Sequence, residues 1–439
     1  MQTNFMPAAL DEPHMRESEK VLRTCVHCGF CTATCPTYLL LGDELDSPRG
    51  RIYLIKDMLE NAARPSERIV KHVDRCLSCL SCMTTCPSGV NYMHLVDHAR
   101  AYIEKTYRRP LVDRALRSLL AWVLPNPARM RLALRAAALA RPFRGLISKI
   151  PAGSRLTAMI DLAPATSWKP RLSGPSVVPS VGNKNGRVAI LSGCAQRALA
   201  PGINEAATRL LTRNGIEVVF PAGEGCCGAL VHHLGREESA LADARRNVDA
   251  WNAAIAEGGL DAIVVTTSGC GTMIKDYGFM LRNDDEYREK AARVSGLAKD
   301  ITEYLCEIEL SPPVRKTGQE VAYHSACSMQ HGQQIRDQPK ALLKKMGFVV
   351  KDVTEGHICC GSAGTYNILQ PEIANQLRAR KVANITRTGA IAVATGNLGC
   401  MTHIGKGMDI PIVHTVEMVD WATGGPLPKN LAATFTNDK

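Results

Sequence analysis

The stretch CVHCGFCTATCP at residues 25–36 recurs as CLSCLSCMTTCP at residues 76–87. Each run spaces four cysteines as C-x2-C-x2-C-x3-C and ends on proline. Three thiolates two residues apart can bind three iron corners of one cube from a single loop, while the fourth reaches away to the second cluster. We therefore expect two [4Fe-4S] clusters, one on Cys25, Cys28, Cys31 and Cys86 and the other on Cys76, Cys79, Cys82 and Cys35.

A pair of zinc sites is the alternative interpretation of these cysteines. Zinc ribbons are built from two CxxC pairs and need neither a third cysteine nor a proline at these offsets, so the doubled pattern favours iron. The residues between the runs include a predicted helix over 52–63. His27 and Arg49 lie where a hydrogen bond or a charge can tune a cluster.

The remaining cysteines form an internal repeat. Cys194 is followed, after 31 residues, by the triplet CCG at residues 226–228, and Cys327 is followed, again after 31 residues, by CCG at residues 359–361. Cys306 alone lies outside both patterns, on an apolar helix where a buried position is expected. We call the two copies the CCG repeats, and their cysteines are Cys194, Cys226, Cys227 and Cys270 in the first and Cys327, Cys359, Cys360 and Cys400 in the second.

Each CCG repeat alternates predicted strands with predicted helices. Such alternation is typical of parallel sheets with helices on both faces, and ligand residues then gather beyond the carboxyl ends of the strands. The fold class is therefore α+β overall, with a helical two-cluster ferredoxin-like domain followed by two α/β repeats. The predicted strands are residues 187–191, 216–220 and 261–267 in the first repeat and residues 320–324, 348–353 and 390–395 in the second.

Four convergent cysteines in each repeat can hold an iron-sulfur cluster, hold zinc or perform dithiol chemistry. Two adjacent cysteines on one small ion would be strained, whereas a cluster offers separate irons, so an iron-sulfur function is favoured over zinc and over a metal-free dithiol. Histidines near these cysteines are candidate ligands or acid-base groups, although a hydrogen-bonded loop histidine is the simpler interpretation. They are His232, His233, His324, His331, His357 and His403.

With both motifs in view, the chain resembles the iron-sulfur subunits of bacterial glycolate oxidase (glycolate dehydrogenase) over essentially its full length. CCG repeats also occur in heterodisulfide reductase, lactate-utilisation and anaerobic glycerol-3-phosphate dehydrogenase subunits, and the long runs beside the cysteines narrow the choice. The matching runs are CVHCGFCTATCPTY from Cys25, GDELDSPRGRIYLIK from Gly42, CMTTCPSGV from Cys82, GCCGA around Cys226, SGCG at Cys270 and ICCGSAGTY around Cys359.

The resemblance implies an electron-carrying subunit of an oxidoreductase. Glycolate, and in some cases D-lactate, would be oxidised on FAD in a partner subunit, beside a second flavin-domain-like subunit, with a respiratory-chain acceptor such as a quinone. In the heterodisulfide reductase relatives the repeats have an additional cysteine, at the positions that Thr267 and Asn397 occupy here. The alternatives are a thiol/disulfide redox subunit, or the electron-transfer subunit of a lactate or glycerol-3-phosphate dehydrogenase. No catalytic residue and no flavin motif is expected in this chain.

The positive charge of the chain is concentrated in one segment. The sequence has 53 Lys and Arg against 42 Asp and Glu, a net charge of +11. Residues 105–155 hold twelve of the positive residues but only Asp113 of the negative ones. Such a basic amphipathic segment either packs against protein or lies on an anionic membrane surface. Nucleic acid is not an expected partner, because aromatic residues are scarce in the segment and no DNA-binding motif appears.

The composition is that of an ordinary globular protein, with 45% hydrophobic residues. No stretch has the roughly 18 consecutive apolar residues of a membrane-spanning helix, and the amino end lacks an export signal. A cytoplasmic protein, peripheral on the inner membrane, is therefore expected. The expected organisation is a ferredoxin-like domain at 1–106, a basic helical segment at 107–163, a linker at 164–186, the CCG repeats at 187–310 and 319–424, and a tail at 425–439.

Overall fold

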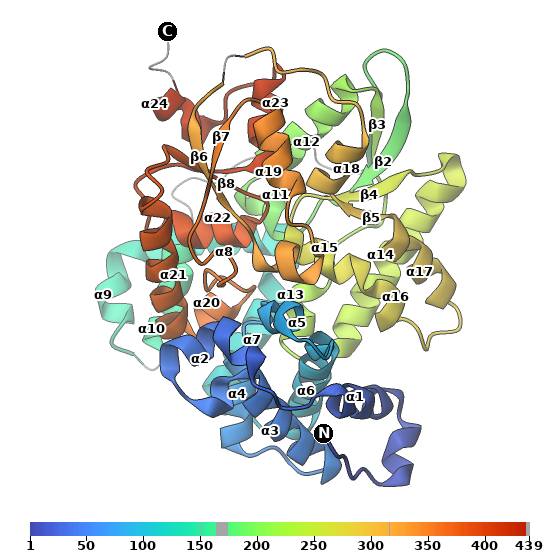
Figure 1. Cartoon of the computed structure of the whole chain (residues 1–439), viewed down its shortest axis with the longest axis vertical. Helices are drawn as coiled ribbons and strands as arrows, with labels where there is room; N and C mark the ends of the chain where they lie inside the picture. Colours follow the sequence, from blue (N-terminus) through green and yellow to red (C-terminus); the bar gives the residue numbers. More distant parts are fainter. Residues whose placement is uncertain (151, 164–173, 316, 436–439) are drawn as a thin grey trace.

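The amino-terminal part of the chain is helical. The computed structural model describes residues 1–150, 152–163, 174–315 and 317–435. Short helices surround the two cysteine runs and form one end of the molecule, drawn in blue in Figure 1. They are α1 (Pro13–Thr24), α2 (Pro36–Leu41), α3 (Pro48–Glu60), α4 (Glu67–Asp74), α5 (Ser81–Thr85) and α6 (Tyr92–Thr106), with the 3-10 helices η1 (Pro7–Asp11), η2 (Phe30–Thr34) and η3 (Glu44–Asp46).

Capping residues and proline set the start of these helices. Ser47 accepts a hydrogen bond from the Gly50 amide, and Pro48 occupies the first turn of α3, where a missing N–H costs nothing. Residues Val21, Leu22, Ile55, Met58 and Leu95 belong to the buried core that α1, α3, α4 and α6 share. This core holds the two cysteine loops at a fixed separation.

The basic segment folds into four further helices. They are α7 (Leu111–Val123), α8 (Pro127–Ala140), α9 (Arg144–Ile147) and α10 (Gly153–Leu162), with the 3-10 helix η4 (Arg141–Phe143). Leu116, Leu120 and Val123 are buried on one side of α7, so part of the predicted apolar face packs against protein. No helix among the described residues is both long and apolar enough to cross a membrane.

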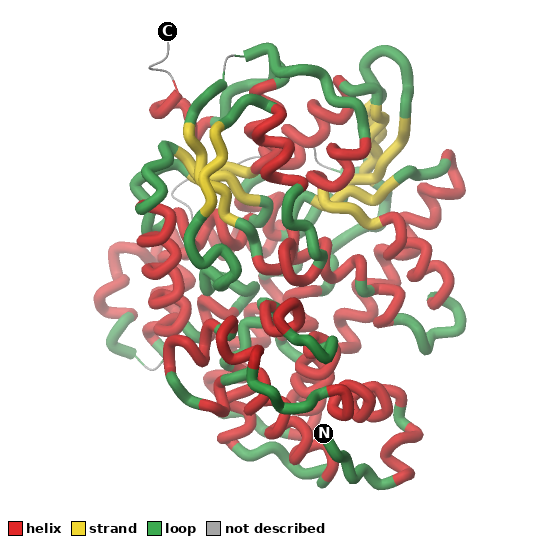
Figure 2. The backbone as a smooth tube through the Cα atoms, viewed as in Figure 1, coloured by secondary structure: helices red, strands yellow, loops and turns green. Residues whose placement is uncertain are grey.

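Each CCG repeat contains a parallel sheet, and the two sheets lie at the opposite end from the amino-terminal helices (Figure 2). The first has the order β1-β3-β2-β4-β5 and the second β7-β6-β8-β9, so the strands that correspond in the repeats stand in the same order. All neighbours are parallel except β1 and β3. The strands are β1 (Ser176–Val178), β2 (Gly186–Ile190), β3 (Ile216–Phe220), β4 (Ala262–Val265), β5 (Ala298–Asp300), β6 (Glu320–His324), β7 (Val349–Asp352), β8 (Ala392–Thr395) and β9 (Ile412–His414).

Helices cover both faces of each sheet, as the alternating pattern predicts. In the first repeat they are α11 (Ala195–Leu199), α12 (Gly202–Arg213), α13 (Ala229–His233), α14 (Glu237–Gly258), α15 (Ser268–Lys275), α16 (Tyr277–Met280), α17 (Arg288–Leu297) and α18 (Ile301–Glu307). In the second they are α19 (Gln338–Lys345), α20 (Tyr366–Leu369), α21 (Pro371–Thr386), α22 (Leu398–Gly405), α23 (Thr415–Ala422) and α24 (Ala432–Phe435), with the π-helix η5 (Ser328–Gly332) and the 3-10 helix η6 (Lys429–Leu431).

The two repeats share one apolar core. Alternate residues of β2 face different cores: Val188 and Ile190 join the shared core, whereas Ala189 packs on the outer side of the sheet. In β6, Val321 faces the shared core and Ala322 the outer one. Helices α12, α18, α19 and α23 lie between the two sheets (Figure 1). The cysteine-bearing loops follow the carboxyl ends of the strands.

The structure confirms the predicted fold class and adds short strands that the sequence pattern did not indicate. Strand β1 pairs antiparallel with β3 and falls in the expected linker, of which residues 164–173 lie outside the described residues. Strands β5 and β9 extend the sheets beyond the three predicted strands of each repeat. The expectation for Cys306 is wrong, because its side chain is exposed on α18.

Candidate metal centres

The two cysteine runs adopt the same backbone conformation. His27 and Ser78, which stand just before the second cysteine of each run, both have positive φ angles, 56° and 48°. Gly29 and Leu80, just after that cysteine, have φ angles of 87° and 61°. Left-handed residues turn the chain tightly, so each run curls back and brings its first three cysteines to one side.

A pseudo-symmetric contact joins the two runs. The short helices η2 and α5 follow the loops at corresponding positions and pack together. Across this contact Thr85 donates a hydrogen bond from its hydroxyl to Thr34 Oγ1 at 3.2 Å. The fourth cysteine of each run, Cys35 or Cys86, follows directly and therefore lies beside the other run.

Two adjoining hollows receive the eight cysteines. The first has about 430 Å³ of empty space and the second about 320 Å³, and Cys82 and Tyr92 line both. The cysteines around the first hollow are Cys25, Cys28, Cys31, Cys86 and Cys82, and those around the second are Cys35, Cys76, Cys79 and Cys82. Each hollow thus has in its lining the four cysteines that the spacing grouped together, with Cys82 also at the first, and four thiols are the ligand set of a [4Fe-4S] cluster.

Burial sets the electrostatics of these thiols. It raises the pKa of Cys31 to about 11 and, with neighbouring thiols, raises the pKa values of Cys79 and Cys82 well above the usual range. Thiolates in such surroundings need compensating positive charge, which an iron core supplies when it binds. The donor set therefore suits a soft cationic group and not a solvated dithiol.

A buried arginine stands beside the second hollow. The Arg51 side chain is 1% exposed and donates to Cys35 Sγ at 3.8 Å and to Thr37 Oγ1 at 3.0 Å. It also contacts the Asp46 carboxylate at 3.2 Å. Sequence reasoning missed this residue, since an arginine within a helix gives no sign that it is buried. The Tyr92 hydroxyl donates to Cys76 Sγ at 3.8 Å on the same side.

In the first CCG repeat the four cysteines converge beyond the strand ends. Cys194 follows β2, and its Sγ lies 3.5 Å from that of Cys226. Cys227 is buried next to Cys270, which α15 presents after β4, and the Cys226 and Cys270 thiols contribute to raising the pKa of Cys227 well above its usual value. The predicted gathering on one rim is therefore present.

The second repeat places its cysteines in the same way. Cys327 Sγ lies 3.4 Å from Cys359 Sγ, and Cys360 Sγ lies 3.5 Å from Cys400 Sγ. Lys381 on α21 is almost fully buried near these thiols and donates to the Glu355 carbonyl at 2.8 Å. Burial lowers the pKa of this lysine, and the thiols oppose that shift.

The glycine of each CCG triplet allows a helix to approach closely. Gly228 and Gly361 have φ angles of 84° and 92°, which side-chain-bearing residues rarely adopt. A Cβ atom on Gly361 would lie 2.6 Å from the Ala374 carbonyl oxygen of α21. The amides of both glycines also lie within 3.5 Å of the first cysteine sulfur of their triplet, so the triplet fixes sulfur, backbone and helix together.

The second repeat, rather than the first, adjoins the second hollow. Cys79 of the hollow packs in one apolar cluster with Cys327 and Cys359 of the repeat. Two polar contacts hold the second repeat against the helical part beside this hollow. The Thr84 hydroxyl lies 2.7 Å from His331 Nδ1, and the Tyr366 hydroxyl donates to the Arg75 carbonyl at 3.0 Å.

The histidines near the repeat cysteines have different environments. His232 forms an ion pair with Asp97 on α6, His331 contacts Thr84, and His403 Nε2 lies 3.1 Å from the Ala374 carbonyl oxygen. His324 differs, because neither ring nitrogen has a hydrogen-bond partner among the described residues. Burial and the nearby Lys381 lower the pKa of His324 well below its usual value, so its ring is neutral.

Comparison with known proteins gives the class of this chain. A family described as "4Fe-4S dicluster domain" matches residues 21–90, and one described as "Cysteine-rich domain" matches residues 188–275 and 321–405. A crystal structure of a hypothetical protein from Helicobacter pylori has a similar fold, with a TM-score of 0.54 and 11% identity, over 98% of this chain and 75% of that one. The chain is thus an iron-sulfur protein with one domain of the 4Fe-4S dicluster family and two cysteine-rich domains.

Full-length relatives narrow the class to a family. The chain is 43% identical to the glycolate oxidase iron-sulfur subunit of Escherichia coli, covering 96% of this chain and 99% of that protein. It is 31% identical to a probable glycolate oxidase iron-sulfur subunit of Bacillus subtilis, over 93% and 96%. Lactate utilization protein A of Bacillus licheniformis matches 53% of the chain at 26% identity. The chain belongs to the family of glycolate oxidase iron-sulfur subunits.

Proposed function

We propose that this chain is the electron-transfer subunit of a glycolate oxidase complex. The observation that carries the proposal is that the eight cysteines lie around two adjoining hollows, each of which has three cysteines of one run and the last cysteine of the other in its lining, with Cys82 shared by both. The ligands are Cys25, Cys28, Cys31 and Cys86 for the first cluster, and Cys76, Cys79, Cys82 and Cys35 for the second. A bound [4Fe-4S] cluster supplies reversible one-electron transfer.

The two hollows are mostly shielded by buried side chains, but one cysteine of the first hollow is exposed. Tyr92, Ile52 and Leu77 close the hollows with apolar or buried side chains, which excludes water. Cys28 is exposed on the first hollow, between Val26 and Phe30, whose side chains are 66% and 62% exposed. An apolar rim around an exposed ligand is suited to docking another redox protein.

Substrate chemistry belongs to partner subunits in this proposal. Glycolate is oxidised to glyoxylate on FAD in a separate catalytic subunit, with a second flavin-domain-like subunit in the complex, and this chain passes the electrons to a respiratory-chain acceptor such as a quinone. The family of the chain supports this assignment. The second CCG repeat adjoins the second hollow, so its cysteines lie next to the proposed redox centre.

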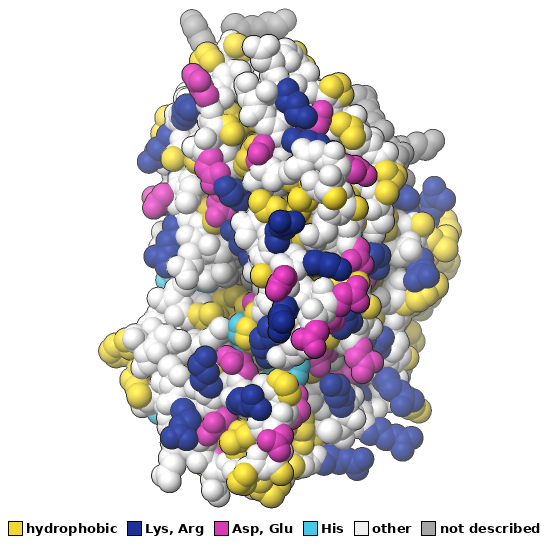
Figure 3. Space-filling view, turned by 90° about the vertical axis from the view of Figure 1, so that its right-hand side faces the viewer, with side chains coloured by type: hydrophobic (Ala, Val, Ile, Leu, Met, Phe, Trp, Pro, Cys, Tyr) yellow, Lys and Arg dark blue, Asp and Glu magenta, His cyan; other side chains and the backbone are white. Residues whose placement is uncertain are grey.

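Attachment to the inner membrane is part of the proposal. Nine of the twenty large hydrophobic side chains that are exposed in the described part of the chain lie within 111–150, among them Leu111, Trp122 and Leu139. Lys and Arg side chains lie beside hydrophobic ones along the right-hand margin of Figure 3. Exposed apolar and basic side chains together favour the surface of an anionic bilayer.

Replacing Cys28 by serine tests the electron-transfer role. We expect iron content and the EPR spectrum of the reduced protein to change, and acceptor reduction by the assembled complex to fall at least a hundredfold, because one cluster loses a thiolate ligand. Flavin in the partner subunit should stay reducible by glycolate.

Cys306→Ser is the matched control, since this thiol is also exposed but lies outside the cysteine patterns. It should keep wild-type iron content and activity. Wild-type iron, EPR spectrum and acceptor reduction in Cys28→Ser would contradict the proposal, as would a wild-type protein isolated without air that contains zinc but no iron.

A further inference from the structure

His324 is an unpartnered buried histidine at the end of β6. Its side chain is 2% exposed, and neither ring nitrogen has a hydrogen-bond partner among the described residues. A buried polar group without a partner loses the hydrogen bonds that it makes to water, and an imidazole has two such atoms. Native structures tolerate this where a ligand completes the site.

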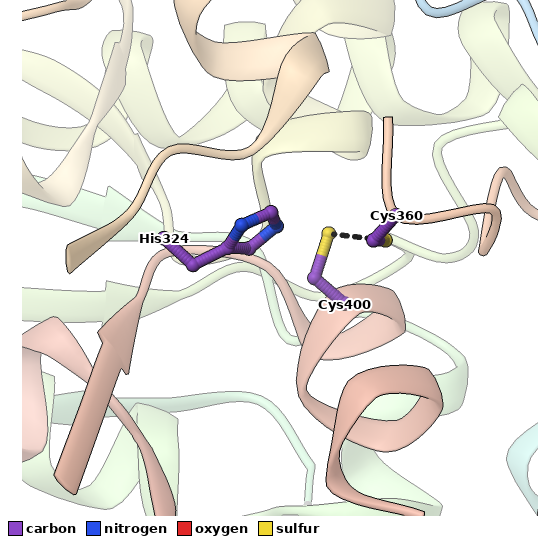
Figure 4. A group of neighbouring side chains, drawn as sticks. All are labelled: His324, Cys360 and Cys400. Carbon is purple, nitrogen blue, oxygen red and sulfur yellow. Dashed lines mark hydrogen bonds between the residues drawn. The ribbon is translucent and has the colours of Figure 1, made fainter. Parts of the chain in front are cut away.

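Two cysteines from elsewhere in the second repeat face this ring. Figure 4 shows His324 at the strand end, Cys360 on the loop and Cys400 on α22 around one point. One ligand atom from each residue lies within 4.8 Å of the other two, and all three side chains are buried. His324 and Ala322 stand two apart on one strand, so both face the outer core, which contains Cys360 and Cys400.

The spacing of the sulfurs suits a single metal ion. Cys360 Sγ and Cys400 Sγ are 3.5 Å apart. Two sulfurs bound at about 2.3 Å to one tetrahedral zinc ion lie about 3.8 Å apart, so these thiols need to move only slightly. Thiolates that bind different irons of a cluster are held farther apart than two ligands of one ion.

We propose that the second CCG repeat binds one zinc ion through His324, Cys360 and Cys400. Two thiolates and a neutral imidazole balance the charge of a divalent ion, and a neutral site can be buried without a large desolvation cost. Mixed cysteine and histidine ligands are typical of zinc.

A threonine beside the ring can orient it. Thr395 of β8 stands opposite His324 in the strand register, and its Oγ1 is also buried without a hydrogen-bond partner among the described residues. Histidines that bind a metal through one nitrogen usually donate the other N–H to a neighbouring oxygen. Thr395 Oγ1 takes this role in the proposed site.

The first repeat does not have these polar residues. Leu191 occupies the position that corresponds to His324 relative to the first cysteine of the repeat, and Val265 the one that corresponds to Thr395 relative to the last cysteine. Both are buried in the outer apolar core of the first sheet. The two CCG repeats therefore hold different groups, and imidazole ligation is confined to the second.

Zinc content of His324→Leu tests the site, because this change gives the second repeat the side chain that the first one has. The full chain, isolated without air, should hold about one zinc per chain in competition with a chelator, and the variant at least tenfold less. His324→Cys, which restores a soft ligand, should retain zinc. Zinc retained by His324→Leu overturns the proposal.

His403→Leu is the matched control for lost stability. His403 is buried in the same repeat, but it contacts the Ala374 carbonyl, and the charges around it are those of Arg378 and Lys406 and not thiols. The His403→Leu variant should keep its zinc. Equal loss of zinc in both leucine variants overturns the ligand role of His324.

Zinc X-ray absorption of the wild-type protein gives a second test that needs no variant. The expected first shell contains nitrogen at about 2.0–2.1 Å and sulfur at about 2.3 Å. A shell of sulfur alone, or a protein that contains iron but no zinc, overturns the proposal. Neither readout requires glycolate oxidation, so failure of the electron-transfer proposal and failure of this one are distinguishable.

Discussion

Arg51 shows how a single side chain can hold a cluster loop in place. It lies among Cys35, Thr37, Asp46 and the carbonyl of His72, all in a dry interior. Asp46 is fully buried and also binds Arg75 at 2.8 Å. Removing one partner of a buried ion pair leaves the other charge uncompensated, so this network depends on every member.

We expect Arg51→Met to lower the free energy of unfolding by about 3–5 kcal/mol, measured as loss of helical circular dichroism in urea. Arg144→Met is the control. The pair of Arg144 with Asp161 is exposed, 56% and 40% for the two side chains, so its loss should change the free energy of unfolding far less. Equal losses in the two variants would show that the buried network has no special role.

Residues that recur at fixed spacing could be predicted, and residues that act by burial could not. The grouping of Cys86 with the first run follows from the motif and stays a prediction, since Cys86 and Cys82 both line the first hollow. Arg51 and His324 belong to no motif, since their roles depend on which neighbours the fold brings to them. A comparison of the repeats position by position would have set His324 against Leu191, and this difference was the available signal.

At the scale of elements, α7 and α8 combine two roles. Arg109 and Arg117 are buried and bind Asp74 at 2.6 and 2.8 Å, which agrees with the interpretation that the segment packs against the protein. Arg114 and Arg135 are exposed, and neither forms an ion pair with any residue that the structure describes. These unpaired cations and the exposed apolar side chains form the outer surface on which the proposed membrane attachment depends.

The double variant Arg114→Ser/Arg135→Ser should bind vesicles containing anionic phosphatidylglycerol roughly 30-fold more weakly, at about 1 kcal/mol for each charge. Sedimentation with vesicles measures this. Arg68→Ser/Arg293→Ser removes the same charge from exposed positions elsewhere and should leave binding unchanged. Equal binding by all three proteins, or no binding by the wild type, would remove membrane attachment from the proposed function.

Long elements with a regular pattern could be predicted, whereas three-residue strands could not. The predicted strand 216–220 is β3 itself, and the predicted helix over 52–63 overlaps α3. Strands β1, β5 and β9 have three residues each. A segment this short shows no periodicity, and pairing with a neighbouring strand decides its conformation.

At the scale of the whole molecule, several ion pairs join the helical part to the first repeat, and one of them joins Asp97 to His232. Asp97 on α6 and His232 on α13 lie 3.4 Å apart. Burial opposes both charges, but the pair outweighs it: the pKa of Asp97 falls well below its usual 3.8, and that of His232 rises above its usual 6.5. The stabilisation is therefore complete between pH 3.8 and pH 6.5, the ordinary pKa values of the two groups. It is lost as pH rises through the raised pKa of His232 or falls through the lowered pKa of Asp97.

Hydrogen exchange of α6 and α13 should accordingly show greater protection at pH 6 than at pH 8.5, after correction for intrinsic rates. His232→Gln should weaken protection at pH 6 and remove most of this pH dependence, because glutamine carries no proton to lose. Identical pH profiles in the two proteins would mean that other groups govern the contact.

The shared core of the repeats limits which parts of the chain can be lost or changed. The inner faces of the two sheets are covered by the helices that lie between them, with Val188 and Val321 in the same apolar interior. Neither copy can be shed without exposing that interior to water. Both repeats must therefore keep the apolar residues of the shared core. Residues near the cysteines do not belong to that core, so Leu191 and His324 can differ between the two repeats.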